Sequence, residues 1–97
     1  MGVYKLSVAA TIDLENVFEY GILQFGIQNA LTYMEAMEKH FVLLSDNPEL
    51  GRGAAALASG LRRFSYGSHS IFYLVIPKGI LVVRVLHQSM DYEQHLP

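Results

Sequence analysis

Hydrophobic and polar residues alternate with two different periods along the chain, and the change of period separates predicted strands from predicted helices. Val3–Val8 alternates with a period of two, which predicts a short strand. Ala9–Gly26 instead repeats its apolar residues at helical spacing, and Gly26 is a typical residue to end a helix. Asp13 and Glu15 lie early in this helix, where we expect them to complement its dipole.

A second helix is predicted to begin directly after the first, at Ile27. Its apolar residues fall at steps of 4, 3, 4 and 3, namely at Ala30, Met34, Met37, Phe41 and Leu44. This heptad spacing predicts one continuous apolar face. Pro48 should end the helix, because proline lacks an amide hydrogen and restricts the residue before it. Two helices with so short a connection are expected to form an antiparallel hairpin.

The last third of the chain returns to a period of two. It predicts three strands joined by turns at Gly67-Ser68 and Pro77–Gly79, and the strands are Leu61–Tyr66, His69–Ile76 and Ile80–His87. Both faces of His69–Ile76 are apolar, so we expect this strand to be central and covered on both sides. The order β-α-α-β-β-β predicts an α+β fold, in which an N-terminal strand and a helical hairpin pack with an antiparallel sheet.

The segment Asn47–Gly60 separates the hairpin from these strands. It is rich in glycine and alanine, which favours a loop with at most one helical turn in its alanine run. Arg52, near the start of this loop, is expected to tie it to the sheet.

Composition limits the chain to one small domain, which we expect to span residues 1–97. Hydrophobic residues make up 52% of it, enough for a core and for some apolar surface kept for a partner. The net charge of −2 argues against direct sequence-specific binding of nucleic acid, which needs cations for the phosphates. The lack of cysteine excludes disulfides and thiol nucleophiles. No apolar segment at the N-terminus is long enough for a signal or a membrane anchor, so we expect a cytoplasmic protein without a membrane partner.

Polar residues that could bind a target gather in the predicted sheet, at Arg62, Arg63, Arg84 and His87. Neighbouring residues of a strand point to opposite faces, so only one of Arg62 and Arg63 can share a face with Arg84. These arginines could clamp a carboxylate or another anion, or they could be a solvated side chain and an internal ion pair.

Catalysis is a second interpretation of the same strands. His69 and Tyr66 could carry out acid–base chemistry on RNA, or they could be a hairpin residue and a packing aromatic. No spacing in the sequence forces these groups together, so the packing interpretation is favoured over catalysis. His87 and Asp91 lie four residues apart, but no further ligands accompany them, so neither a metal site nor a cofactor is expected.

Four segments in the same order resemble ParE-type toxins of the RelE/ParE toxin–antitoxin superfamily. They are YKLSVAATIDLENVFEYGILQFG, NPELGR, GLRRFSYGSHSIFYLV and VVRVLHQSMDYEQHL, which together extend from Tyr4 to Leu96. The resemblance implies a strand, a helical hairpin and an antiparallel sheet. It also implies a toxin that binds DNA gyrase at its A subunit, stabilises a plasmid or chromosomal segment and is neutralised by a ParD-like antitoxin. Such a toxin is an inhibitor and not an enzyme, so no catalytic residue is expected.

The resemblance further implies that the antitoxin covers apolar residues of the hairpin, for which Phe18, Ile22 and Tyr33 are the candidates. The sister branch of RelE-like toxins cleaves mRNA on the ribosome and is the alternative function. Only seven cations face nine acids in this chain, which argues against that alternative. The alanine-rich loop GRGAAALASG leaves a third possibility, a toxin-like regulator that has lost its toxicity.

Overall fold

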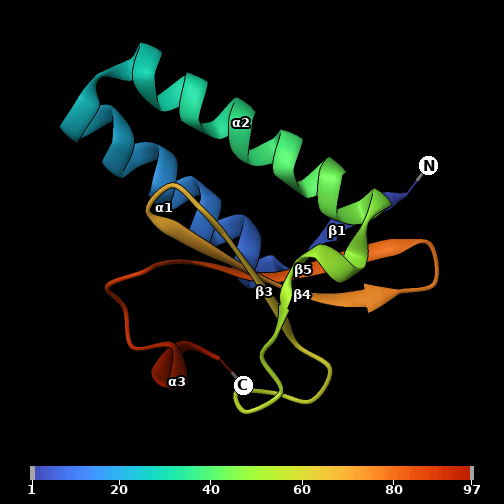
Figure 1. The fold of residues 1–97 in the computed structure, drawn as a ribbon. Helices are drawn as coiled ribbons and strands as arrows, with labels where there is room; N and C mark the ends of the chain where they lie inside the picture. The colour runs from blue at the N-terminus through green and yellow to red at the C-terminus, as the bar shows by residue number, and fades with distance from the viewer. Residues whose placement is uncertain (1, 97) are drawn as a thin grey trace.

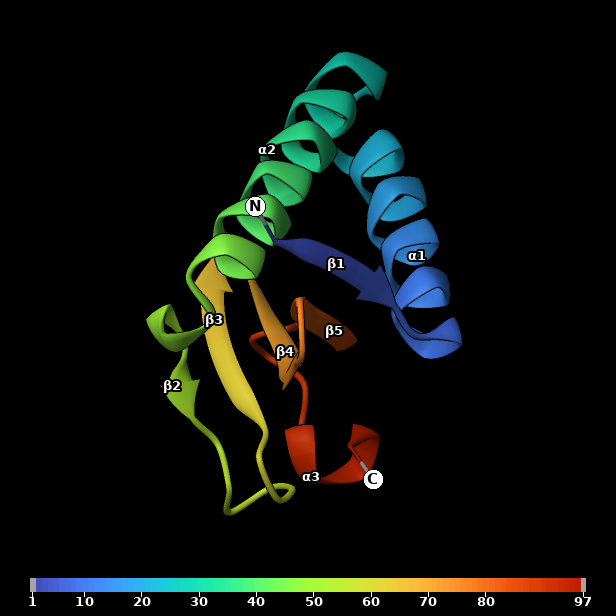
Figure 2. The same ribbon diagram turned by 90° about the vertical axis from the view of Figure 1, so that its right-hand side faces the viewer.

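The chain folds into a five-stranded sheet with a helical hairpin on one face and a short helix on the other (Figures 1 and 2). A computed structural model describes residues 2–96. In chain order the elements are β1 (Val3–Leu6), α1 (Val8–Phe25), α2 (Ile27–Asp46), the 3₁₀ turn η1 (Pro48–Leu50), β2 (Arg52–Gly53), β3 (Arg62–Tyr66), β4 (His69–Ile76), β5 (Gly79–His87) and α3 (Tyr92–His95). The strand order across the sheet is β1-β5-β4-β3-β2. The predicted α+β class is confirmed, and the structure adds the short elements β2 and α3.

The sheet is mixed because β1 runs parallel to β5, whereas the other three strand pairs are antiparallel. Gly79 pairs with Val3 at the start of this contact. A Cβ atom at Gly79 would lie 1.7 Å from the carbonyl oxygen of Val3, so only glycine allows the two strands to approach this closely. The helical hairpin follows β1 in the chain and leads back to the sheet. This allows the N-terminal strand β1 to lie beside the last strand, β5.

The switch from β1 to α1 occurs at Ser7, earlier than the predicted strand end. The Ser7 hydroxyl accepts a hydrogen bond from the amide of Ala10 at 2.9 Å, which caps the helix. The same hydroxyl donates to the carbonyl oxygen of Val83 in β5 at 2.7 Å. The prediction that Asp13 and Glu15 complement the helix dipole is wrong, because the first turn of α1 contains no acidic residue.

Both helix stops are confirmed at Gly26 and at Pro48. Gly26 has a φ of 83°, a conformation that residues with a side chain rarely adopt, and its amide donates to the carbonyl of Ile22. The helix α2 ends at Asp46, shortly before Pro48 begins the 3₁₀ turn. Its predicted apolar seam is buried at four of five positions, and Met34 is half-buried.

Two hydrophobic clusters lie on opposite faces of the sheet. Ile71 and Tyr73 of β4 point into the larger cluster beneath the hairpin, whereas Phe72 and Leu74 pack in the smaller cluster beneath α3. This alternation confirms that β4 is a central strand covered on both faces. Figure 2 shows the three resulting layers, with the hairpin above the sheet and α3 below it.

The loop after α2 is held by one tyrosine and one arginine of the sheet. The buried hydroxyl of Tyr73 donates to the carbonyl of Pro48 at 2.6 Å and accepts from the amide of Gly51 at 2.8 Å. Arg62 donates to the carbonyl oxygens of Glu49 and Gly51 at 3.0 and 2.7 Å. Arg62 therefore ties the loop to the sheet, whereas the side chain expected to do so, that of Arg52, is exposed.

None of the helices among residues 2–96 combines the length and the apolar character that crossing a membrane requires.

Replacing Tyr73 by phenylalanine should lower the free energy of unfolding by about 2 kcal/mol, because it leaves an amide and a carbonyl without their buried partner. Urea denaturation measures this change. Tyr20→Phe is the matched control, since the Tyr20 side chain is largely exposed and its removal should change stability by less than about 0.5 kcal/mol. Equal unfolding midpoints for Tyr73→Phe and the wild type would contradict the role of this hydroxyl.

Candidate functional site

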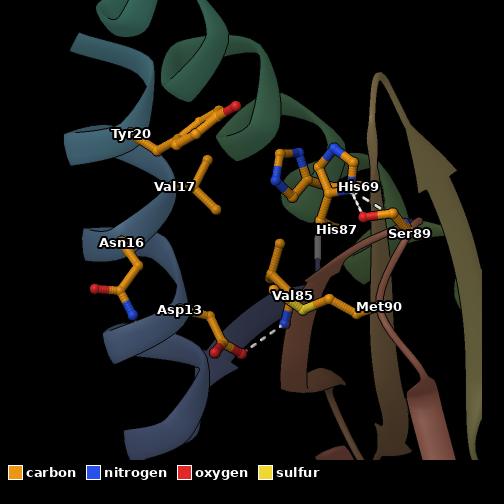
Figure 3. Close-up of a pocket in the computed structure, with 9 residues that line it drawn as sticks. All are labelled: Asp13, Asn16, Val17, Tyr20, His69, Val85, His87, Ser89 and Met90. Atoms are coloured by element: carbon orange, nitrogen blue, oxygen red, sulfur yellow. Dashed lines mark hydrogen bonds between the residues drawn. The ribbon is translucent and has the colours of Figure 1, made fainter. Parts of the chain in front are cut away.

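An open cleft lies between α1 and the ends of β4 and β5, and we call it the α1 cleft. Its outer part is a cavity of about 410 Å³. Figure 3 shows the residues around it, which are Asp13, Asn16, Val17, Tyr20, His69, Val85, His87, Ser89 and Met90. Side chains of α1 form one wall, and the two histidines and Met90 face them from the sheet side.

The α1 cleft continues toward the tip of the hairpin as a second cavity of about 190 Å³. The two cavities share the side chains of Val17, Tyr20, His69 and His87, so they form one continuous groove. The second part is lined further by Gly21, Phe25, Asn29, Ala30, Tyr33, Met34 and Ser68. Apolar side chains dominate the lining of both parts, and Asp13 and Asn16 add polar groups at the outer end.

Asp13 closes the outer end of the groove by docking α1 on the edge of β5. Its carboxylate accepts hydrogen bonds from Nε and Nη2 of Arg84 at 2.7 and 2.8 Å, and from the amide of Val85 at 3.0 Å. Arg84 also donates through Nη1 to the carbonyl of His95 in α3 at 2.5 Å. The hydrogen bond to Asp13 raises the pKa of Arg84 and so stabilises its charged form.

Tyr33 and the histidine pair form the floor of the α1 cleft. The Tyr33 hydroxyl lies 2.7 Å from Nδ1 of His69 and accepts a hydrogen bond from the amide of Ser68 at 3.2 Å. His69 and His87 are direct cross-strand partners whose rings meet edge to face at 5.3 Å between centroids. Burial lowers the pKa of His69, and the charge of His87 lowers it further, so His69 is held in its neutral form.

Tyr66 joins this floor to the helix α2 by aromatic packing. Its ring stacks on His40 at 4.4 Å between centroids and lies 5.0 Å from the ring of Tyr33. Of the two interpretations of Tyr66, the packing one describes these contacts.

The cleft brings together only part of the residues predicted from the sequence. Tyr33 and His87 line it. Phe18 and Ile22 do not, because a helix turns by about 100° per residue and this places them on the flank of α1 opposite Tyr20. Both are half-buried there.

The arginines predicted as target contacts lie outside the cleft. Arg62 and Arg84 are held by contacts within the fold, as described above. Arg63 points to the α3 face, where its guanidinium carbon lies 5.7 Å from the centre of the Tyr92 ring. Within residues 2–96, no arginine lines the cleft beside His69, and no group of three or more metal-ligating side chains occurs. This dispersion argues against acid–base cleavage of RNA at the histidines.

Sequence reasoning missed the α1 wall of the cleft, at Asp13, Val17 and Tyr20. These residues are spaced by four and three positions, which places them on one flank of the helix. That spacing was available as a signal. The sequence offered no such signal for Ser89 and Met90, because their position in the cleft depends on how the chain turns after β5.

A solved structure of another protein has the same fold as this chain. The chain superposes on a solved structure described as the chromosomal ParDE TA system from P. aeruginosa, with a TM-score of 0.75 at 20% identity. The match covers 90% of this chain and 96% of that one. The chain therefore shares the fold of that solved structure.

The family follows from the sequence. Residues 4–92 match the family described as the ParE toxin of the type II toxin–antitoxin system, parDE. The chain is 36% identical over 94 residues to Toxin ParE1 of Mycobacterium tuberculosis and 33% identical over 93 residues to Toxin ParE1 of Caulobacter vibrioides. Each alignment covers 96% of both chains. The chain belongs to the ParE toxin family, which confirms the resemblance seen in its sequence.

Replacing His69 by asparagine should make stability less dependent on pH. Because the folded-state pKa of His69 is lowered from its ordinary value of 6.5, its contribution is present above that value and is lost as the pH falls through the folded-state pKa. Asparagine stays neutral and can still hydrogen-bond to Tyr33. Urea denaturation at pH 7.5 and pH 5 should show a smaller loss of stability for His69→Asn than for the wild type.

The control for this experiment is His95→Asn, because the His95 side chain is exposed and its helix, α3, lies on the opposite face of the sheet from α2. If His69→Asn lost as much stability between the two pH values as the wild type does, the neutral state assigned to His69 would be wrong.

Proposed function

We propose that this ParE-family toxin acts by binding and inhibiting DNA gyrase, without a catalytic step of its own, and that a ParD-like antitoxin neutralises it. The observation that carries the proposal is the match to the ParE toxin family over residues 4–92. An open apolar cleft, with no arginine beside its histidines among residues 2–96, supports a protein that works by binding. Gyrase as target places the toxin in the bacterial cytoplasm.

The antitoxin is proposed to occupy the α1 cleft and the tip of the hairpin. Large apolar side chains are exposed there, with Tyr20 at 59%, Phe25 at 66% and Leu23 at 81% of their full accessible surface. Ile27 and Leu31 extend this surface onto α2. An apolar groove of this kind suits an amphipathic segment of a partner, and its burial would remove the exposed apolar area from water. Tyr33 would lie beneath such a segment, whereas Phe18 and Ile22 would be reached only by a segment that crosses the hairpin.

The gyrase contact is proposed to include Arg63 and His87, which reach the surface on opposite faces of the sheet. Arg62 and Arg84 would support target binding indirectly, because their guanidinium groups hold the loop after α2 and the helix α1. Replacing either of these two arginines should therefore lower the free energy of unfolding, and it should weaken gyrase binding only as a consequence.

The experiment for the target is a supercoiling and DNA-cleavage assay with purified gyrase. We expect inhibition together with an accumulation of cleaved DNA, and we expect the ParD-like antitoxin to reverse both. Unchanged supercoiling in the presence of excess folded toxin would overturn the proposal. An in vitro translation assay would then separate mRNA cleavage from a complete loss of toxicity.

Replacing Tyr20 by alanine should weaken antitoxin binding roughly tenfold, because exposed aromatic residues at the centre of an apolar groove dominate such interfaces. Isothermal titration calorimetry with the antitoxin measures the change. Ile12→Ala is the matched control, since Ile12 is a large exposed apolar residue of the same helix that does not line the cleft. Equal affinities for the two variants would place the antitoxin outside the cleft.

A further inference from the structure

Two arginines face each other across the outer strand pair of the sheet. Arg52 of β2 and Arg63 of β3 are direct antiparallel partners, so their side chains leave the same face about 5 Å apart at Cβ. Like charges in this position repel each other. Among residues 2–96 the single ion pair is that of Arg84 with Asp13, and no side-chain hydrogen bond involves Arg52 or Arg63. The fold thus leaves this charge pair uncompensated.

A polar cavity of about 300 Å³ lies beside the pair. It is lined by Leu50, Arg52, Arg63, Phe64 and Ser65. Arg63 pairs with Phe72 of β4, which belongs to the cluster beneath α3, so the side chains of Arg63 and Ser65 point to the α3 face. The contact of Arg63 with the Tyr92 ring holds its guanidinium on that face. The cavity shares no lining residue with the α1 cleft and is therefore separate from it.

The backbone of β3 is open at the same place. The amide of Ala54 donates to the carbonyl of Leu61 at 2.7 Å, and this bond fixes which residues of β3 direct their peptide groups toward β2. By alternation these are Leu61, Arg63 and Ser65. Because β2 is only two residues long and pairs with Arg62 and Arg63, no strand of the described chain covers the outward peptide groups of Ser65.

We propose that this edge is a binding site for an acidic, extended segment of a partner protein, with one Asp or Glu carboxylate held between Arg52 and Arg63. A carboxylate would remove the repulsion between the two guanidinium groups and accept charge-assisted hydrogen bonds from both. The backbone of the same segment would pair with the amide and carbonyl of Ser65, as in the addition of a strand to a sheet edge.

The charge distribution favours a protein segment over nucleic acid. Nucleic acid presents a phosphate at every step and is bound through a row of cations. Here two arginines stand alone, since Arg62 and Arg84 are held within the fold and the chain carries a net charge of −2. The inference deepens the proposed function, because it specifies the charge of one partner segment. Its test requires neither gyrase nor the antitoxin.

The test is an NMR titration of ¹⁵N-labelled toxin with a capped hexapeptide of alternating Val and Glu. We expect the amide signals of Arg63 and Ser65 and the Nε–H signals of Arg52 and Arg63 to shift, and the Gln version of the peptide to bind more weakly. Arg52→Gln and Arg63→Gln should each weaken binding roughly fivefold. Lys78→Gln removes an exposed cation elsewhere and should leave binding unchanged.

A stability measurement distinguishes a binding site from a structural role. Arg52→Gln should leave the urea midpoint at low salt unchanged or raise it, because it relieves repulsion, whereas the loss of a structural arginine would lower it. The proposal is overturned by a lowered midpoint or by the absence of shifts at millimolar acidic peptide. It is also overturned if a single-stranded oligonucleotide shifts the same signals at lower concentration than the peptide does. A negative result in these two experiments would not change the result expected in the gyrase assay.

Discussion

The outer edge of β5 is the constraint on which the rest of the structure depends. β1 pairs with β5 only from Gly79 to Val82, so the second half of β5 needs other partners for its peptide groups. Ser7 donates to the carbonyl of Val83, and Asp13 accepts from the amide of Val85. A buried peptide group without a partner would cost about 1–3 kcal/mol. These bonds dock the first half of α1 against the sheet, whereas its second half makes no such bond to β5, and the α1 cleft opens between the two elements.

A β-bulge makes this docking possible. The register between β4 and β5 shifts at Phe72 and Tyr73, where β5 contains one extra residue. Val82 and Val85 therefore both face the hairpin core, although three positions separate them. The bulge also brings Arg84 to the sheet margin, where it binds Asp13 of α1 and the carbonyl of His95 in α3. One guanidinium group thus joins the layers above and below the sheet.

The sequence predicted those features that depend on burial of a whole face. The period of two found the long strands, the heptad spacing found the buried seam of α2, and Gly26 marked the hairpin tip. The early end of β1 was missed, because Ser7 gains its second partner from a residue 76 positions away. The flank of α1 that forms the cleft was missed for a related reason. This helix carries apolar residues on both flanks, and only the position of β5 separates the flank of Phe18 from that of Tyr20.

The arginines divide into two pairs with different surroundings, and this division bears on how the toxin meets its partners. Arg62 and Arg84 donate hydrogen bonds to carbonyl and carboxylate oxygens of the fold, so the basic residues of the sheet are not one patch. Arg52 and Arg63 remain, on the α3 face at the edge opposite β1. The apolar cleft lies on the hairpin face beside β5. A partner segment seated in the cleft alone would leave this arginine pair exposed. Occupation of both surfaces therefore requires either one segment long enough to pass around the sheet or two partners bound at the same time.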